Sequence, residues 1–142
     1  MRRLLALGLA AIAVAFAVPE LRAQPSPGAS RVVEIRSYNL KPGTRDRFHQ
    51  TFLKQALPML RRWKVDVVGY GPSLHDQDSY FLMRGFEGVE QRQKSEDAFY
   101  GSDEWIKGPR ERILADIVSY TTIVITMHAA AIDGLRRAAM PR

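Results

Sequence analysis

The order of strand-like and helix-like segments between residues 32 and 127 constrains the fold of this chain more than any other feature. Alternating patterns rich in β-branched and aromatic residues indicate four strands. Apolar residues three and four positions apart indicate two helical regions. We expect strands at residues 32–40, 65–74, 79–87 and 119–127, and helical regions at residues 44–62 and 88–116.

This order of segments predicts an α+β fold of the ferredoxin-like βαββαβ type. The second and third strands are separated by a short polar turn and form a hairpin. Because parallel crossovers are right-handed in nearly all proteins, both helical regions should lie on one face of a four-stranded antiparallel sheet. A chain of 142 residues has room for one such domain.

Prolines and glycines divide the two helical regions. Pro58 lies inside the first region, where it removes a hydrogen bond and predicts a kink. In the second region Gly101 and the Gly108-Pro109 pair interrupt the pattern, and Ser102 is a suitable N-cap for a new piece. The apolar stripe of the first region consists of Phe48, Phe52, Ala56, Met59, Leu60 and Trp63.

The two faces of the expected sheet differ in chemistry, because side chains alternate across each strand. One face is apolar or small, with residues such as Val33 and Ile35, and we expect it to pack under the helices. The other face is mixed and includes Glu34, Arg36, Tyr38, Val68, Tyr70, Tyr80, Leu82, Arg84 and Phe86. A mixed face with so many aromatic residues needs a cover, which predicts a homodimer that packs this face against a second copy of the chain.

The polar members of the mixed face are the candidate binding residues. Glu34, Arg36, Tyr38, Tyr70 and Arg84 would then surround a cavity suited to a small, largely apolar molecule. The alternative is that Glu34 pairs with Arg36 or Arg84 only to neutralise buried charge. The residues alone leave both interpretations open.

Several kinds of site are not predicted by this sequence. The chain has no cysteine, which excludes disulfides and thiolate ligands. His75, Asp76 and Asp78 lie together in the hairpin turn, but turns favour Asp for backbone reasons and no second ligand motif accompanies them. We therefore expect no metal site and no cofactor, and no catalytic residue is assigned.

The first 23 residues have the pattern of a cleavable signal peptide. Arg2 and Arg3 precede 15 apolar residues, and a short stretch that begins with Pro19 leads to the expected cleavage site after Ala23. A retained membrane anchor is the alternative, but a span needs about 20 apolar residues. We expect a periplasmic or secreted protein without a stable membrane anchor after cleavage.

The remaining chain divides into a linker at residues 24–31, a domain at residues 32–127 and a tail at residues 128–142. Residues 1–23 contain three arginines and one glutamate, so cleavage lowers the formal net charge from +6 to +4. The basic residues that remain are scattered rather than clustered. We therefore expect no nucleic-acid partner.

Three segments resemble the NIPSNAP family: VEIRSYNLKPG at residues 33–43, VVGYG at residues 67–71 and SDEW at residues 102–105. The resemblance covers roughly residues 32–127. It implies a homodimer of the dimeric α+β-barrel superfamily, whose distant members include cofactor-independent oxygenases, dehydratases and haem-handling proteins. The resemblance assigns no reaction; a cofactor-independent oxidation or isomerisation is one expectation, and a non-catalytic module of the cell envelope is the alternative.

Overall fold

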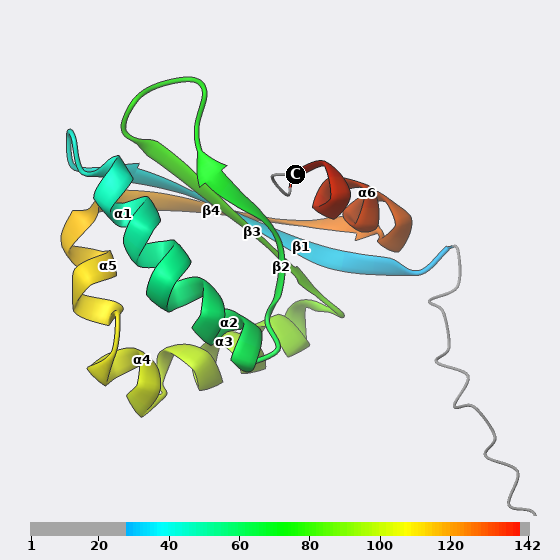
Figure 1. Ribbon diagram of the computed structural model, residues 1–142. Coiled ribbons are helices and arrows are strands. Elements are labelled where there is room, and N and C mark those ends of the chain that lie inside the picture. Colours follow the sequence, from blue (N-terminus) through cyan, green and yellow to red (C-terminus); the bar gives the residue numbers. More distant parts are fainter. Residues whose placement is uncertain (1–27, 140–142) are drawn as a thin grey trace, which may run out of the picture.

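A four-stranded antiparallel sheet organises the computed structural model, which describes residues 28–139 (Figure 1). The strands are β1 (Ser30–Leu40), β2 (Asp66–Pro72), β3 (Ser79–Phe86) and β4 (Ile117–His128), in the spatial order β2-β3-β1-β4. This arrangement confirms the predicted ferredoxin-like α+β fold. The expected signal peptide and the first half of the expected linker lie outside the described residues, and β1 begins two residues earlier than predicted.

Helices cover the sheet unequally on its two sides (Figure 1). The chain enters α1 (Arg45–Thr51), continues through the π-helical turn η1 (Phe52–Ala56) and ends in α2 (Leu57–Arg62). The second helical region consists of α3 (Val89–Tyr100), α4 (Asp103–Lys107) and α5 (Arg110–Asp116). These five helices and η1 lie on one face, whereas the tail forms α6 (Ala129–Ala139) against the other.

The π-helical turn lies where the sequence predicted a kink. Pro58 has no N–H, and its ring would crowd the carbonyl of Lys54 in a regular α-helix. The backbone widens just before it, so that the Leu57 N–H donates to the carbonyl of Phe52 five residues back. The stripe of apolar residues on this helix remains on the sheet side, with Phe48, Phe52 and others buried.

The predicted N-cap at Ser102 is confirmed. Its hydroxyl oxygen accepts a hydrogen bond from the backbone N–H of Trp105 at 3.2 Å and thereby starts α4. Trp105 itself is buried against α3. The cap therefore fixes the position of an aromatic side chain that borders the cavity described below.

The prediction of which sheet face the helices cover was wrong. Helices α1 to α5 cover the mixed face. Tyr38, Tyr80 and Leu82 lie in one core with the aromatic residues of α1 and α3. Burial on this side removes more aromatic surface from water than burial of Val33 and Ile35 would. The charged residues of the mixed face are accommodated because they pair with each other.

A bulge in β2 explains why Val68 was also assigned to the wrong side. The register against β3 shifts between Val67 and Gly69. Because of the extra residue, Val68 lies on the opposite face from Tyr70 and packs with Val33 and Ile132 of α6. A strictly alternating assignment cannot anticipate such a shift.

The second face of the sheet is only partly covered. Helix α6 buries Val33 and Val68, and its Arg136 donates to Asp66 of β2 at 2.6 Å. Beyond α6, Ile123 and Ile125 of β4 are 53% and 38% exposed. Within residues 28–139, no helix is long and apolar enough to cross a membrane.

Candidate functional site

A cavity of about 350 Å³ lies between the sheet and helices α3 to α5. It opens near β4, where Leu114 and Tyr120 are 44% and 57% exposed. Two arginines and three tyrosines give it polar groups, while Trp105 and the aliphatic residues of α5 and β4 give it apolar walls. The lining residues are Arg36, Tyr38, Tyr100, Trp105, Arg110, Ile113, Leu114, Ile117 and Tyr120.

Arg36 of β1 is held in one position at the wall of this cavity. Its guanidinium carbon lies 5.4 Å from the ring centres of both Tyr100 and Tyr120, in cation–π contact. Its Nη1 donates to the Tyr100 hydroxyl at 2.9 Å, and its Nη2 donates to Glu96 at 2.9 Å. A guanidinium has five N–H donors, so Arg36 retains further donors for a ligand.

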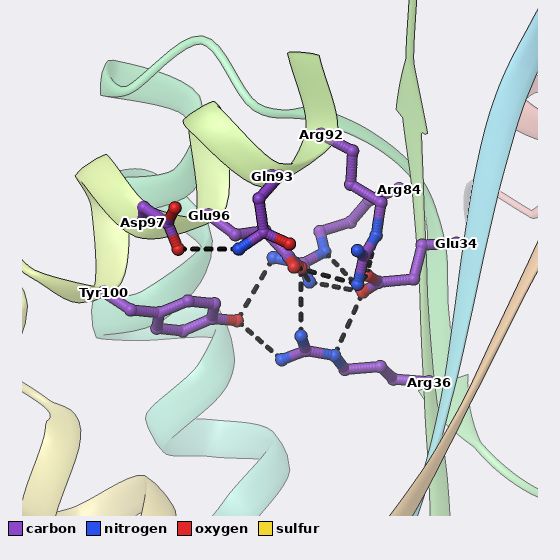
Figure 2. A network of polar contacts seen from close by, with 8 residues as sticks. All are labelled: Glu34, Arg36, Arg84, Arg92, Gln93, Glu96, Asp97 and Tyr100. Carbon is purple, nitrogen blue, oxygen red and sulfur yellow. Dashed lines mark hydrogen bonds and ion pairs between the residues drawn. The ribbon is translucent and has the colours of Figure 1, made fainter. Parts of the chain in front are cut away.

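Behind the cavity, Arg36 belongs to a buried network of charged residues between the sheet and α3 (Figure 2). Glu34 and Arg84 are opposite each other on β1 and β3 and are completely buried. The Arg84 Nε donates to Glu34 at 3.2 Å, and its Nη2 bonds to both Glu34 and Glu96. Both strands and the helix are therefore joined by one arginine.

Helix α3 supplies the other half of the network through residues four positions apart. Arg92 Nε donates to Glu34 at 2.5 Å, and Arg92 Nη2 lies 2.9 Å from Glu96. The Tyr100 hydroxyl accepts from Arg84 at 3.1 Å as well as from Arg36. Three arginines face two glutamates in this network, which leaves one positive charge next to the cavity.

The protonation states follow from these contacts. Burial opposes ionisation of Glu34, but the charges of Arg84 and Arg36 and the hydrogen bonds to the carboxylate together outweigh it, so the pKa of Glu34 falls to about 2. Burial raises the pKa of Glu96, with a further contribution from its hydrogen bond to Glu34. Burial also raises the pKa of Tyr38 to about 12, so this phenol stays neutral at physiological pH.

The five binding residues predicted from the sequence lie in three different places in the structure. Arg36 and Tyr38 line the cavity. Glu34 and Arg84 lie behind it in the network, as the charge-pairing interpretation requires. Tyr70 does not line this cavity and packs its ring 5.0 Å from that of Phe52.

Tyr100, Trp105 and Arg110 line the cavity but were not among the predicted binding residues. One signal was present for the helix α3 residues, because Arg92, Glu96 and Tyr100 recur at intervals of four and must share one helix face. Arg110 had no such signal. It follows a helix-breaking Gly-Pro pair, and only the three-dimensional fold places it in the same cavity as the β1 residues.

The acidic turn of the hairpin has a structural role. Asp76 Oδ1 accepts from the backbone N–H groups of Asp78 at 2.8 Å and Ser79 at 2.6 Å. Within residues 28–139, no three His, Cys, Asp or Glu residues are grouped in a way that could hold a metal ion.

Comparison with known proteins shows similarity of fold. The structure is similar to an uncharacterized NIPSNAP-like domain protein from Burkholderia xenovorans, with 21% identity, a TM-score of 0.64 and coverage of 70% of this chain and 86% of the other. It is also similar to a NIPSNAP family protein from Agrobacterium tumefaciens, with 13% identity, a TM-score of 0.66 and coverage of 75% and 93%.

A putative antibiotic biosynthesis monooxygenase from Nitrosomonas europaea shares the fold at 12% identity, with a TM-score of 0.52 and coverage of 66% of this chain and 95% of the other. No protein-family model matches the chain, and no curated protein matches its sequence. The comparisons therefore establish the ferredoxin-like fold, and the cavity must support the functional argument.

Proposed function

We propose that this chain is an exported, NIPSNAP-like homodimer that binds a small organic molecule in the cavity between the sheet and helices α3 to α5. The cavity itself carries this proposal. Its volume of about 350 Å³ lies in the range of small-molecule sites, and its walls combine aromatic surface with a few fixed polar groups. This site replaces the cavity between two sheets that the sequence suggested.

Preorganisation of the polar groups supports a binding role. Arg36 is fixed by two tyrosine rings and by its bonds to Glu96 and Tyr100 before any ligand arrives. A ligand would therefore not have to immobilise this long side chain, which lowers the entropic cost of binding. The neutral phenol of Tyr38 adds a polar group to the same cavity.

The proposal concerns binding and assigns no reaction. The Nitrosomonas europaea protein shares only the fold with this chain at 12% identity. A non-catalytic module of the cell envelope remains the competing function, and it requires no ligand in the cavity. The two alternatives therefore differ in a measurable way.

A thermal-shift screen of small organic molecules tests the proposal. The comparison is between the wild-type protein and Leu114→Trp, which replaces a half-exposed cavity residue with a larger one. We expect some compounds to raise the Tm of the wild type by several degrees, because ligands that bind only the folded state stabilise it. The same compounds should have little effect on Leu114→Trp.

The control is Leu74→Trp, which introduces the same residue at the fully exposed hairpin. This variant should respond to the compounds as the wild type does. If every compound that stabilises the wild type stabilises Leu114→Trp equally, the cavity is not the binding site. If no compound stabilises any of the proteins, the envelope-module function is favoured instead.

A further inference from the structure

The cavity has a second, inner compartment that differs from the outer one in chemistry. The inner space is small, about 30 Å³, and reaches into the aromatic core. The two compartments are continuous in their walls, because Tyr38, Tyr100, Trp105 and Ile113 line both. The residues found only in the inner wall are all apolar: Phe48, Phe52, Ala56, Leu60, Leu82 and Phe99.

Positive charge is confined to the outer compartment. Arg36 contributes from the network, which carries one excess positive charge, and Arg110 contributes from α5. The Arg110 side chain makes no hydrogen bond or ion pair with any part of the chain that the structure describes. No Asp or Glu lines either compartment. Arg36 is paired with Glu34 and Glu96 behind the wall, so Arg110 supplies the guanidinium that has no carboxylate partner among the described residues.

The π-helical turn forms part of the inner wall. Phe52 and Ala56 are its first and last residues, and both border the inner space. Ala56 has only a methyl side chain, so the helix leaves room at this point. A volume of about 30 Å³ is close to that of one water molecule, which is enough for a terminal methyl group or the edge of a ring.

Resting on the proposed function, we infer that the ligand is an anionic amphiphile, such as a monocarboxylic acid with an alkyl or aromatic end. Its carboxylate would lie between Arg36 and Arg110 at the outer end, where charge-assisted hydrogen bonds are strong. Its apolar end would point toward Ala56 in the inner compartment. Charge at one end and a dry apolar wall at the other select this class over neutral or cationic molecules.

Calorimetric titration with octanoate and with 1-octanol tests the role of charge, since the two differ only in the head group. We expect the wild-type protein to bind octanoate at least about tenfold more tightly, a difference of about 1.4 kcal/mol. The preference should shrink by threefold or more in Arg110→Gln. It should be unchanged in Arg112→Gln, which removes the same charge from an exposed position on α5 that does not line the cavity.

The chain length of the acid tests the role of the inner compartment. In the wild type, affinity should rise from butanoate to octanoate as the apolar end reaches the inner walls. Ala56→Leu should remove the gain for octanoate while leaving butanoate binding nearly unchanged. Circular dichroism melting of Ala56→Leu verifies that the variant is folded. If the variant does not fold, the chain-length series in the wild type still tests the role of the inner compartment.

The outcomes separate this inference from the proposed function. Equal affinity for octanoate and 1-octanol, or an equal loss of preference in Arg110→Gln and Arg112→Gln, would overturn the anionic class while leaving a ligand-binding cavity intact. Binding of neither probe, together with a screen in which no compound acts through the cavity, would remove both. Octanoate preference that depends on Arg110 alone supports both.

Discussion

At the scale of single residues, the helix-covered face of the sheet depends on mutual pairing of buried charges. Glu34 and Arg84 have almost no contact with solvent, yet each is bonded to several partners from other elements. Removing one member of such a set leaves an unpaired buried charge, which typically costs about 3–5 kcal/mol. The network therefore ties the position of α3 to the ionisation of its glutamates.

Acid should weaken the fold through Glu34. Its pKa falls from the ordinary 4.5 to about 2 in the folded protein, so its contribution is present above pH 4.5 and disappears as the pH falls toward 2. This corresponds to about 3 kcal/mol of unfolding free energy. The pKa of Glu96 shifts upward, which acts in the opposite direction and reduces the net loss.

Urea denaturation at a series of pH values measures this effect. The wild type should lose stability as the pH falls from 6 to 2, whereas Glu34→Gln should start lower at pH 6 and show a smaller loss. Glu90→Gln, at an exposed position on α3, should follow the wild type. Parallel pH profiles for the wild type and Glu34→Gln would show that this carboxylate is not the responsible group.

The sequence was informative about these residues only in part. Glu34, Arg36 and Arg84 stood out because charged residues alternate with aromatic ones on predicted strands. Arg92 and Glu96 carried a weaker signal, since charged residues four positions apart on a helix are most often solvated. That they meet the strand residues depends on which face α3 covers, and local pattern does not determine this.

At the scale of elements, the sequence predicted the helix cap and the helix breaks, but it did not predict the form of the local irregularities. Ser102 predicted the start of α4 because its hydroxyl can satisfy a free backbone N–H. The π-helical turn before Pro58 and the bulge at Val68 each add one residue to a regular pattern. Pro58 marks the place of the first irregularity but not its form, and no distinctive residue type marks the bulge.

Replacement of the α4 cap should have a modest and local cost. Ser102→Ala removes the acceptor for the Trp105 N–H and should lower the free energy of unfolding by about 1 kcal/mol. Ser95→Ala, inside α3, is the matched control and should be neutral or slightly stabilising because alanine favours the helix. Urea denaturation of both variants provides the comparison, and equal effects would contradict a capping role for Ser102.

At the scale of the whole molecule, the partly uncovered face of the sheet is the feature that the proposed homodimer explains. Ile35 and Met83 adjoin the exposed Ile123 and Ile125 through the strand register, so apolar residues from three strands form one surface. Helix α6 packs mainly against β2 and covers only part of this face. A second copy of the chain is the cover that we propose for the remainder.

Light scattering on the chain without residues 1–23 should give twice the mass of one protomer. Ile123→Asp places a charge on the uncovered face and should produce monomers or shift the equilibrium strongly toward them. Leu74→Asp makes the same kind of change at the exposed hairpin and should leave the dimer intact. A wild-type monomer at low micromolar concentration would contradict the proposal.

The composition of β4 has a consequence for the handling of this protein. This edge strand spans Ile117–His128 and contains no proline, lysine, arginine, aspartate or glutamate. Edge strands of most proteins carry such residues, which hinder pairing with strands of other molecules. A protomer whose β4 edge stays exposed would present a template for amyloid-like growth, so mild destabilisation should favour fibrils over reversible unfolding.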